Sequence, residues 1–386
     1  MALLQRITPD DGHYFFGYYD LQPFSSDNRL HLAHRVSFMD RLQKAGDRCD
    51  IGLIDLTDRS FHKLTETESW NFQQGAMLQW NPIAPNSQIL FNCFREGEYQ
   101  TCCLDIRNNA TRYLSRPVAN VSRDGKWGLS INFSRLYDFR PGYGYPCKQD
   151  PHFYENHPAE DGVFLVDMVT GNSRLILSLE TLWNFTGSYF DGDRKLVINH
   201  ITWNPDATRF VLLLRNFPTD ARPHRTAVIT ADRNGENLFL LSDYGYFSHY
   251  YWEGPRDLIA YADGKELAVC QGIQNYRLQD LSYNGSIIDA QSFPEDNHMS
   301  LSPCGRYLLN DAYPDENREQ KLFVYDLREK ENISLGRFYS PVFPVIDIRC
   351  DLHPRWSYHS GLVSFDSVHE GFRGIYTIEA GGNLWK

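Results

Sequence analysis

Four histidines occupy equivalent positions in a pattern that recurs along the chain. The pattern runs from a polar or histidine start through an aromatic residue, an Asn-Pro or Ser-Pro turn and a basic residue to an apolar run. A lone inward histidine is usually a satisfied core residue, but four in register, out of 13 in the chain, predict a functional site. Each lies five residues before the same repeat position, in the segments His200 to Pro205, His249 to Gly254, His298 to Pro303 and His353 to Tyr358.

The first chemistry that clustered imidazoles suit is metal binding, because Zn²⁺ and Mn²⁺ accept several imidazole ligands. Cys350 stands three residues before His353 and offers a thiolate at ligand-like spacing, which favours zinc. The carboxylate of neighbouring Asp351 weakens that preference. The alternative for Cys350 is an ordinary buried thiol, because cysteine is among the most buried residue types.

The competing chemistry is proton transfer. A neutral imidazole, with an ordinary pKa of about 6.5, can remove a weakly acidic proton near neutral pH. A planar guanidinium binds a carboxylate through two parallel hydrogen bonds, so Arg215, Arg225 and Arg355 are candidates for holding an acidic sugar. The alternative for each arginine is pairing with a structural Asp or Glu.

The segment His13-Tyr-Phe-Phe-Gly-Tyr-Tyr-Asp20 holds five aromatic residues in eight positions. Core packing explains most of them. Sugar rings stack on aromatic faces, however, and a tyrosine can also donate its hydroxyl. We therefore take Tyr18 and Tyr19 as candidate substrate-binding residues.

An insertion between about residues 136 and 160 is rich in Gly and Pro and predicts a non-helical loop. Loops on a rigid scaffold often carry binding residues, so His152 in this loop is a further candidate for substrate binding. The alternative is a plain surface excursion.

The elements that must position these residues are short and repeated. Turns of the recurring pattern fall near residues 27, 87, 125, 207, 256, 305 and 360, and β-rich apolar runs lie between them. Such units predict an all-β fold, a seven-bladed β-propeller with four-stranded antiparallel blades, and residues 1–386 as one domain. The alternative is a pair of β-sandwich domains. A turn of helix is expected only around residues 179–184.

Composition excludes several classes of protein. The net charge is 38 − 49 = −11 and no basic run occurs, so we expect no nucleic acid partner. No stretch reaches the roughly 18 apolar residues of a membrane helix, and the start lacks a hydrophobic signal region, so we expect a cytoplasmic protein with no membrane partner. The eight cysteines show no Cys-x-x-Cys spacing and predict reduced thiols.

Standard catalytic signatures are absent from the sequence. It contains no Gly-x-Ser-x-Gly, no Gly-x4-Gly-Lys-Ser/Thr, no Gly-x-Gly-x-x-Gly and no His-Glu-x-x-His. Serine hydrolysis and nucleotide chemistry therefore lose support.

Several motifs together resemble the oligogalacturonate lyases and, more distantly, the propeller ulvan lyases. They are Gly12-His-Tyr-Phe-Phe-Gly-Tyr-Tyr-Asp20, the His-x4-Pro units, Asp351-Leu-His353-Pro-Arg-Trp356 and Phe365-Asp-Ser-Val-His369-Glu370. The resemblance covers nearly the whole chain. It implies a propeller in which a His and an Arg act on a uronate while a divalent metal, usually manganese, binds its carboxylate.

By that resemblance His249 corresponds to the base, Arg225 to the arginine, and His298 and His353 to metal ligands. The chain departs from the family pattern at two ligand positions, where a Gln and a His are replaced by Cys350 and Arg355. Either the metal is zinc held through Cys350, or the metal is lost and Arg355 supplies the positive charge.

The function implied is β-elimination on a uronate-containing oligosaccharide, a short one because the overall negative charge repels long polyanions. The alternatives are a binding propeller with a structural metal, and a glycoside hydrolase using carboxyls among Asp20, Asp311 and Asp366. The predicted residues are His200, Arg215, Arg225 and His249 for catalysis, Tyr18, Tyr19, His152 and Arg355 for substrate, and His249, His298, Cys350 and His353 for metal.

Overall fold

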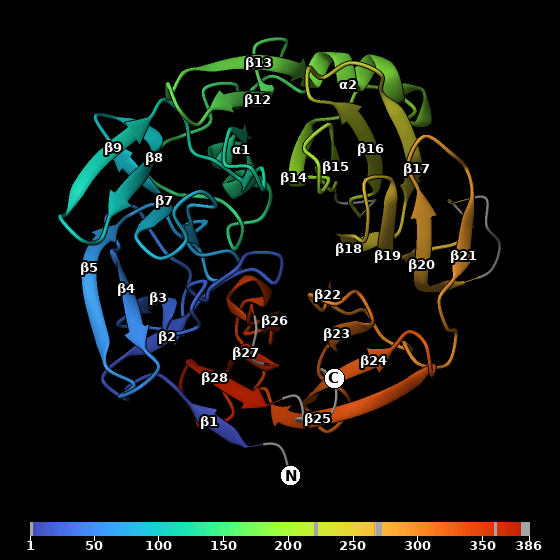
Figure 1. Cartoon of the computed structure of the whole chain (residues 1–386). Helices are drawn as coiled ribbons and strands as arrows, with labels where there is room; N and C mark the ends of the chain where they lie inside the picture. The colour runs from blue at the N-terminus through green and yellow to red at the C-terminus, as the bar shows by residue number, and fades with distance from the viewer. Residues whose placement is uncertain (1–2, 220–222, 266, 268–271, 359–360, 380–386) are drawn as a thin grey trace. The chain divides into compact units, whose positions relative to one another are not determined.

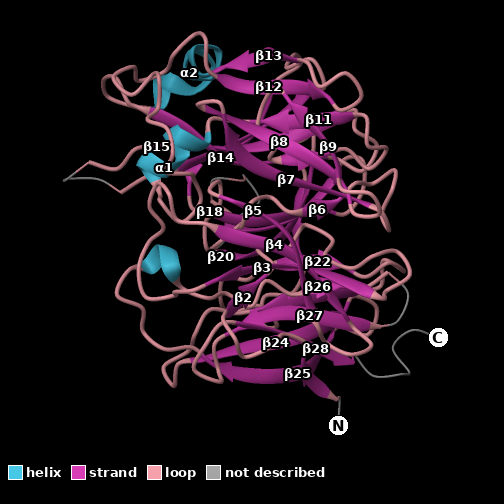
Figure 2. Cartoon of the chain, turned by 90° about the vertical axis from the view of Figure 1, so that its left-hand side faces the viewer, coloured by secondary structure: helices cyan, strands magenta, loops and turns pink. Residues whose placement is uncertain are grey.

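The structure, a computed structural model, describes residues 3–219, 223–265, 267, 272–358 and 361–379. Strands dominate this part of the chain, and helical turns are confined to a few connections (Figure 2). Two compact units are present: unit 1 comprises Met1–Asn92, Cys103–Thr111 and Gln291–Lys386, and unit 2 comprises Cys93–Cys102 and Arg112–Ala290. The expectation of a single domain stays a prediction. No helix of the described residues is long and apolar enough to cross a bilayer.

The strands form seven four-stranded antiparallel sheets, which confirms the predicted fold class, a seven-bladed β-propeller (Figure 1). Three sheets lie in unit 1: β2 (His13–Phe15), β3 (Leu30–Val36), β4 (Cys49–Asp55) and β5 (Phe61–Thr67); β22 (Met299–Leu301), β23 (Tyr307–Asp311), β24 (Glu319–Asp326) and β25 (Glu331–Tyr339); and β1 (Leu4–Arg6), β28 (Gly374–Glu379), β27 (Leu362–Ser367) and β26 (Arg355–Trp356).

Three sheets lie in unit 2: β10 (Asn120–Val121), β11 (Trp127–Ser130), β12 (Gly162–Asp167) and β13 (Ser173–Ser178); β14 (Leu196–Trp203), β15 (Arg209–Asn216), β16 (Thr226–Asp232) and β17 (Phe239–Gly245); and β18 (Phe247–Trp252), β19 (Asp257–Asp263), β20 (Ile273–Gln279) and β21 (Gly285–Ile287). The remaining sheet has residues in both units and consists of β6 (Gln79–Trp80), β7 (Gln88–Arg95), β8 (Glu98–Asp105) and β9 (Ala110–Leu114).

The recurring sequence pattern marks one hairpin in every sheet. In six sheets the predicted turn falls between the first and second strands in chain order, and the apolar run after it is the second strand. In the sheet that contains β1, the turn falls between β26 and β27, the second and third strands in chain order, and residues 359–360 of this turn lie outside the described residues. In β15 every residue is buried, because a middle strand of a blade is covered on both faces.

One sheet joins the beginning of the chain to its end. β1 pairs with β28 in the register Leu4 to Ile378, Gln5 to Thr377 and Arg6 to Tyr376 (Figure 1). The sheet therefore takes one strand from the start of the chain and three from its end, all within unit 1.

The helices occupy connections between strands. Those of the described residues are α1 (Phe133–Phe139), α2 (Leu179–Thr186) and the 3-10 turns η1 (Gly187–Tyr189) and η2 (Ile346–Ile348). The helix expected around residues 179–184 is confirmed, and Ser178 caps it by accepting a hydrogen bond from the Thr181 N–H. The expectation that the insertion is wholly non-helical is wrong at residues 136–139, because α1, capped by Asn132, extends into it.

The rest of the insertion is anchored by one buried arginine. Arg135 of α1 forms an ion pair of 2.9 Å with buried Asp150 and donates to the carbonyls of His152, Glu155 and Asn156 at 3.0, 2.8 and 2.8 Å. A buried charge requires such partners. The insertion is therefore a pinned loop of unit 2.

A second buried ion pair organises unit 1. Arg355 of β26 meets Asp366 of β27 through two parallel contacts of 3.0 and 3.1 Å. Arg355 also donates to the carbonyls of Gly17 and Tyr18, and Asp366 accepts the N–H groups of Phe16 and Gly17 at 3.2 to 3.3 Å. The pair thus ties the last sheet of the chain to the segment that follows β2.

We predict that breaking this pair destabilises the protein strongly. Asp366→Asn leaves the Arg355 guanidinium buried without its counterion, so the free energy of unfolding should fall by about 3–5 kcal/mol. The double variant Arg355→Met/Asp366→Leu removes both charges and should be more stable than Asp366→Asn. Urea unfolding followed by tryptophan fluorescence measures both values. A double variant less stable than the single one would contradict this account.

Candidate metal and substrate site

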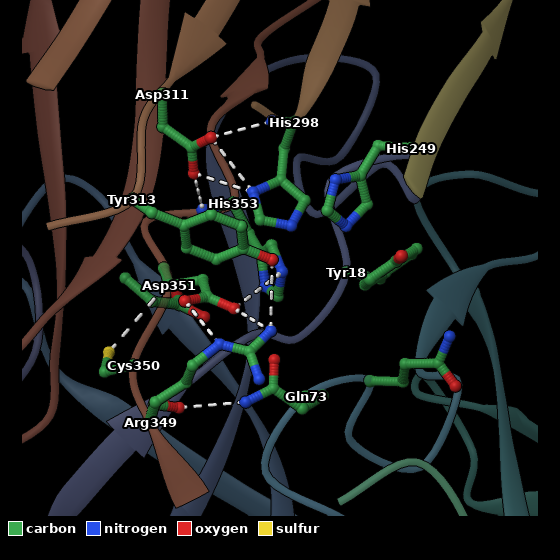
Figure 3. Close-up of polar contacts among 12 residues, drawn as sticks. Tyr18, Gln73, His249, His298, Asp311, Tyr313, Arg349, Cys350, Asp351 and His353 are labelled. Carbon is green, nitrogen blue, oxygen red and sulfur yellow. Dashed lines mark hydrogen bonds and ion pairs between the residues drawn. The ribbon is translucent and has the colours of Figure 1, made fainter. Parts of the chain in front are cut away.

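Three buried side chains of unit 1 form the centre of the candidate site. One ligand atom from each of His298, Asp351 and His353 lies within 4.8 Å of the other two (Figure 3). The rings of the two histidines contact edge to face, with centroids 4.3 Å apart. The structure therefore brings together two of the four predicted metal ligands, and adds Asp351.

Asp311, the last residue of β23, holds both histidines. Its carboxylate accepts the backbone N–H of His298 at 2.8 Å and lies 2.9 and 3.0 Å from Nδ1 of the same residue. The other oxygen accepts the backbone N–H of His353 at 3.1 Å. His353 has a φ of 42°, a left-handed conformation that is strained for a side chain of this size and that the bond to Asp311 helps to hold.

This arrangement sets the chemistry of His298. With Nδ1 donating its proton to Asp311, the lone pair is on Nε2, as in histidines that bind metals with a carboxylate behind them. Burial by itself would lower the pKa of His298, but the charge and hydrogen bond of Asp311, with Asp351 and Asp296 beyond, raise the pKa above its ordinary value. The same negative charge that attracts a proton also attracts a cation.

The predicted substrate residues Tyr18 and Tyr19 lie against the two histidines. The Tyr18 ring contacts His353 edge to face at 5.1 Å, and the Tyr19 ring lies 5.2 Å from that of His298. Gly17 precedes them with a φ of 124°, where a Cβ would meet the Gln74 backbone at 2.9 Å. Only glycine fits that turn, so it fixes where the tyrosines enter the site.

Arg349, Tyr313 and Gln73 are site residues that sequence reasoning missed. Arg349 contacts the Asp351 carboxylate through Nε at 3.0 Å and Nη2 at 2.8 Å, and Nη2 donates to the Tyr313 hydroxyl at 3.3 Å (Figure 3). Gln73 donates to the Arg349 carbonyl at 3.0 Å. The available signal was a basic residue directly beside the predicted ligand Cys350; nothing in the sequence marks Gln73.

Cys350 is not among the clustered ligand atoms. Its thiol lies 3.9 Å from the Asp351 carbonyl, and burial raises its pKa to about 12. A thiolate is therefore disfavoured there. The structure supports the alternative interpretation, a buried thiol, and the neighbouring carboxylate of Asp351 occupies the cluster instead.

Arg355 requires a correction. It was a candidate for binding a substrate carboxylate, but its side chain is buried and the carboxylate that it binds is that of Asp366. Its guanidinium also lies 4.9 Å from the Phe16 ring centroid. Arg355 therefore acts on the position of Tyr18 through the backbone, and does not present its charge to a ligand.

In unit 2, His200 and His249 lie in the first strands of their sheets, each at a break in strand register. The break in β14 falls between Ile198 and Ile201, and the break in β18 between Phe247 and Tyr250. Such bulges re-aim a side chain and are common next to active sites. His249 Nδ1 lies 3.1 Å from the Ser248 hydroxyl.

Two predicted arginines flank His224. Arg215 is buried and donates to the Thr226 hydroxyl at 3.1 Å and to the Asn199 amide oxygen at 2.8 Å, whereas Arg225 is exposed. Burial and the charges of Arg215, Arg140 and Arg225 lower the pKa of His224 to about 4. Three guanidinium groups therefore make one region of unit 2 strongly positive.

The anchored loop contributes to this region. The Arg140 guanidinium lies 4.5 Å from the Tyr143 ring centroid, and the Tyr143 ring contacts that of His200 at 5.7 Å. Sequence reasoning did not single out Arg140, Tyr143 or His224. The predicted substrate residue His152 instead places Nδ1 2.8 Å from Glu155, at the loop surface.

The donor set of unit 1 fits a divalent cation. Ligand atoms bound at ~2.0–2.2 Å lie roughly 3–4.4 Å apart, and His353 Nε2 is 3.9 Å from Asp351 Oδ2. Two imidazoles and a carboxylate suit zinc and manganese alike. Zinc was favoured because of a possible Cys350 thiolate ligand, and the Cys350 thiol is not part of the cluster.

Sequence comparison finds no family model that matches the chain and no matching curated protein. Solved structures do match. An oligogalacturonate lyase in complex with manganese has a TM-score of 0.69 and 14% identity, over 100% of this chain and 95% of that one. An oligogalacturonate lyase from Vibrio parahaemolyticus has a TM-score of 0.65 and 15% identity, over 99% and 94%.

Propellers of other proteins match less well. The β-propeller domain of the Trilobed protease from Pyrococcus furiosus has a TM-score of 0.52 and 9% identity, over 92% of this chain and 93% of that one. At these identities the likeness concerns the fold. The chain thus has a β-propeller fold that resembles those of the oligogalacturonate lyases, as its sequence motifs predict.

Proposed function

We propose that this protein is a lyase that cleaves short uronate-containing oligosaccharides by β-elimination and uses a divalent metal. The observation that carries the proposal is the buried group of His298, Asp351 and His353, oriented by Asp311 and faced by two tyrosines. The likeness in fold to two oligogalacturonate lyases supports it.

The residues of the chain divide the work of such a reaction. β-Elimination removes the proton on the ring carbon beside the carboxylate and expels the glycosidic oxygen at C4, leaving a double bond between C4 and C5. A metal held by His298, Asp351 and His353 would neutralise the carboxylate, which lowers the energy of the developing enolate. We assign proton removal to His249, or to His200, and binding of acid groups to Arg215 and Arg225. We assign packing against a sugar ring to Tyr18 and Tyr19.

Manganese is the metal that we propose, since one solved lyase with this fold contains it and the cluster offers a carboxylate in place of a thiolate. The hydrolase alternative loses support, because two of its three candidate acids have other partners: Asp311 binds the histidines and Asp366 binds Arg355. That the protein is cytoplasmic, and binds neither nucleic acid nor membrane, stays a prediction.

We predict an unsaturated product. Incubation with oligogalacturonate and oligoglucuronate should give a rising ultraviolet absorbance from the C4–C5 double bond. His249→Ala should lower the rate by about 10²–10⁴-fold, the range for loss of a general base. The control is His62→Ala, at an exposed histidine of β5. Silence across both substrates, with one metal bound per chain, would refute the lyase and indicate a binding propeller.

We predict that metal binding depends on the cluster and not on Cys350. Calorimetric titration with Mn²⁺ should show the affinity lost or reduced by more than tenfold in His298→Ala, His353→Ala and Asp351→Asn. Cys350→Ala should bind as the unaltered protein does, because its thiol is outside the cluster. Loss of Mn²⁺ binding in Cys350→Ala alone would contradict this prediction and support Cys350 as a metal ligand.

We predict that Asp311→Asn weakens metal binding by about 10–100-fold, the usual cost of losing the partner behind a ligating histidine. The amide cannot supply the negative charge that orients His298 and fixes its tautomer. Titration with Mn²⁺ measures the loss, and Asp326→Asn, at a carboxylate of the same sheet that pairs with Arg306, is the control. Equal affinities in the two variants would contradict this role.

A further inference from the structure

Arg349 is a cation inside the candidate metal site. Its Nε and Nη2 atoms grip the two oxygens of Asp351, which is the one carboxylate of the ligand group. Oδ2 of Asp351 lies 2.8 Å from Arg349 Nη2 and 3.9 Å from His353 Nε2. The same oxygen thus faces both the guanidinium and the space that a metal would take.

A guanidinium in this place works against metal binding. It neutralises Asp351, and its positive charge repels a divalent cation a few ångströms away, where burial leaves little water to screen the repulsion. A site built only to hold metal would gain from a neutral partner for Asp351, such as a backbone N–H. The guanidinium is therefore better explained as a group that also serves a ligand, whose carboxylate would add to those of Asp351 and Asp311.

Exposure distinguishes Arg349 from the metal ligands. Its side chain is 12% exposed, whereas those of His298, Asp351 and His353 are 2–3% exposed. The Tyr313 hydroxyl supports Nη2 at 3.3 Å, and the Arg349 guanidinium lies 5.4 Å from the Tyr313 ring centroid. Figure 3 shows the guanidinium directed from its own loop toward Asp351 and His353. Arg349 is thus held in place and reachable by a ligand.

We propose that Arg349 binds the carboxylate of the uronate substrate, and that Asp351 shifts from Arg349 toward the metal when both are bound. The proposal rests on the function proposed above. A guanidinium can exchange one carboxylate partner for another, because it donates the same pair of hydrogen bonds to either. After the exchange each cation has a carboxylate partner: the Asp351 carboxylate binds the metal, and the substrate carboxylate pairs with Arg349. Arg349 is then a substrate-binding residue for acidic sugars.

Two alternatives make opposite predictions for Arg349→Met. If Arg349 only holds Asp351 in place, its loss weakens metal binding. If Arg349 instead competes with the metal for Asp351 and binds the substrate carboxylate, its loss leaves the Mn²⁺ affinity unchanged or raises it, and we expect a gain of several-fold. In the same variant, KM for oligouronate should rise more than tenfold. Arg349→Lys should keep part of the substrate affinity, because the charge remains without the planar pair of donors.

The experiment titrates full-length protein with Mn²⁺ by calorimetry, then titrates the metal-free and metal-loaded forms with oligogalacturonate, and finally measures turnover. Arg306→Met, which removes the arginine from another carboxylate pair of unit 1, is the matched control and should change none of the three. Weaker Mn²⁺ binding in Arg349→Met, or unchanged oligogalacturonate affinity, overturns the inference. If the unaltered protein binds oligogalacturonate through Arg349 but produces no double bond, the lyase proposal fails and the inference stands.

Discussion

The buried pair of Arg355 and Asp366 is the constraint on which the geometry of unit 1 depends. Each partner pairs with the other and also binds backbone groups of residues 16–18, so a single ion pair joins the last sheet to the first. His353 stands two residues before Arg355, and Tyr18 directly follows Gly17. The positions of His353 and of Tyr18, which lie on two sides of the candidate site, therefore both depend on this ion pair. Such a pair adds little net stability compared with apolar residues, but it allows only one arrangement of the segments that it joins.

Asp311 continues this constraint into the site. One carboxylate sets the tautomer of His298 and holds the left-handed backbone of His353, so both histidines depend on the same side chain for their position. Asp351 and Arg349 add a carboxylate and a cation beside them. The result is a small volume in which a divalent metal and a guanidinium would carry three positive charges beside two carboxylates, those of Asp351 and Asp311. An acidic ligand completes the balance of charge, which is a physical reason to expect specificity for uronates.

The sequence predicted the fold well because a propeller repeats its signals. The turn and the apolar run of one hairpin recur in all seven sheets, so weak copies such as the one near residue 87 gain support from strong copies such as His200 to Pro205. Contacts between distant segments leave no such signal. The sequence does not show that Arg355 pairs with Asp366, so it suggested that Arg355 binds a substrate carboxylate. Spacing also suggested Cys350 as a metal ligand, because it cannot show that the Asp351 side chain lies beside the histidines instead. Arg349 and Gln73 act through partners that only the fold brings near.

The joining of distant segments also has a consequence for biosynthesis. The N–H of Phe16 finds its acceptor 350 residues later, in Asp366. At about 5–20 residues per second, a ribosome needs roughly 18–70 s to make the intervening chain. For that time the N–H groups of Phe16 and Gly17 lack the carboxylate that later accepts them, and Tyr18 and Tyr19 lack the two histidines that they contact. The sheet of β2 to β5 can form early because residues 13–67 supply all four of its strands, whereas the candidate site is among the last parts of unit 1 to form.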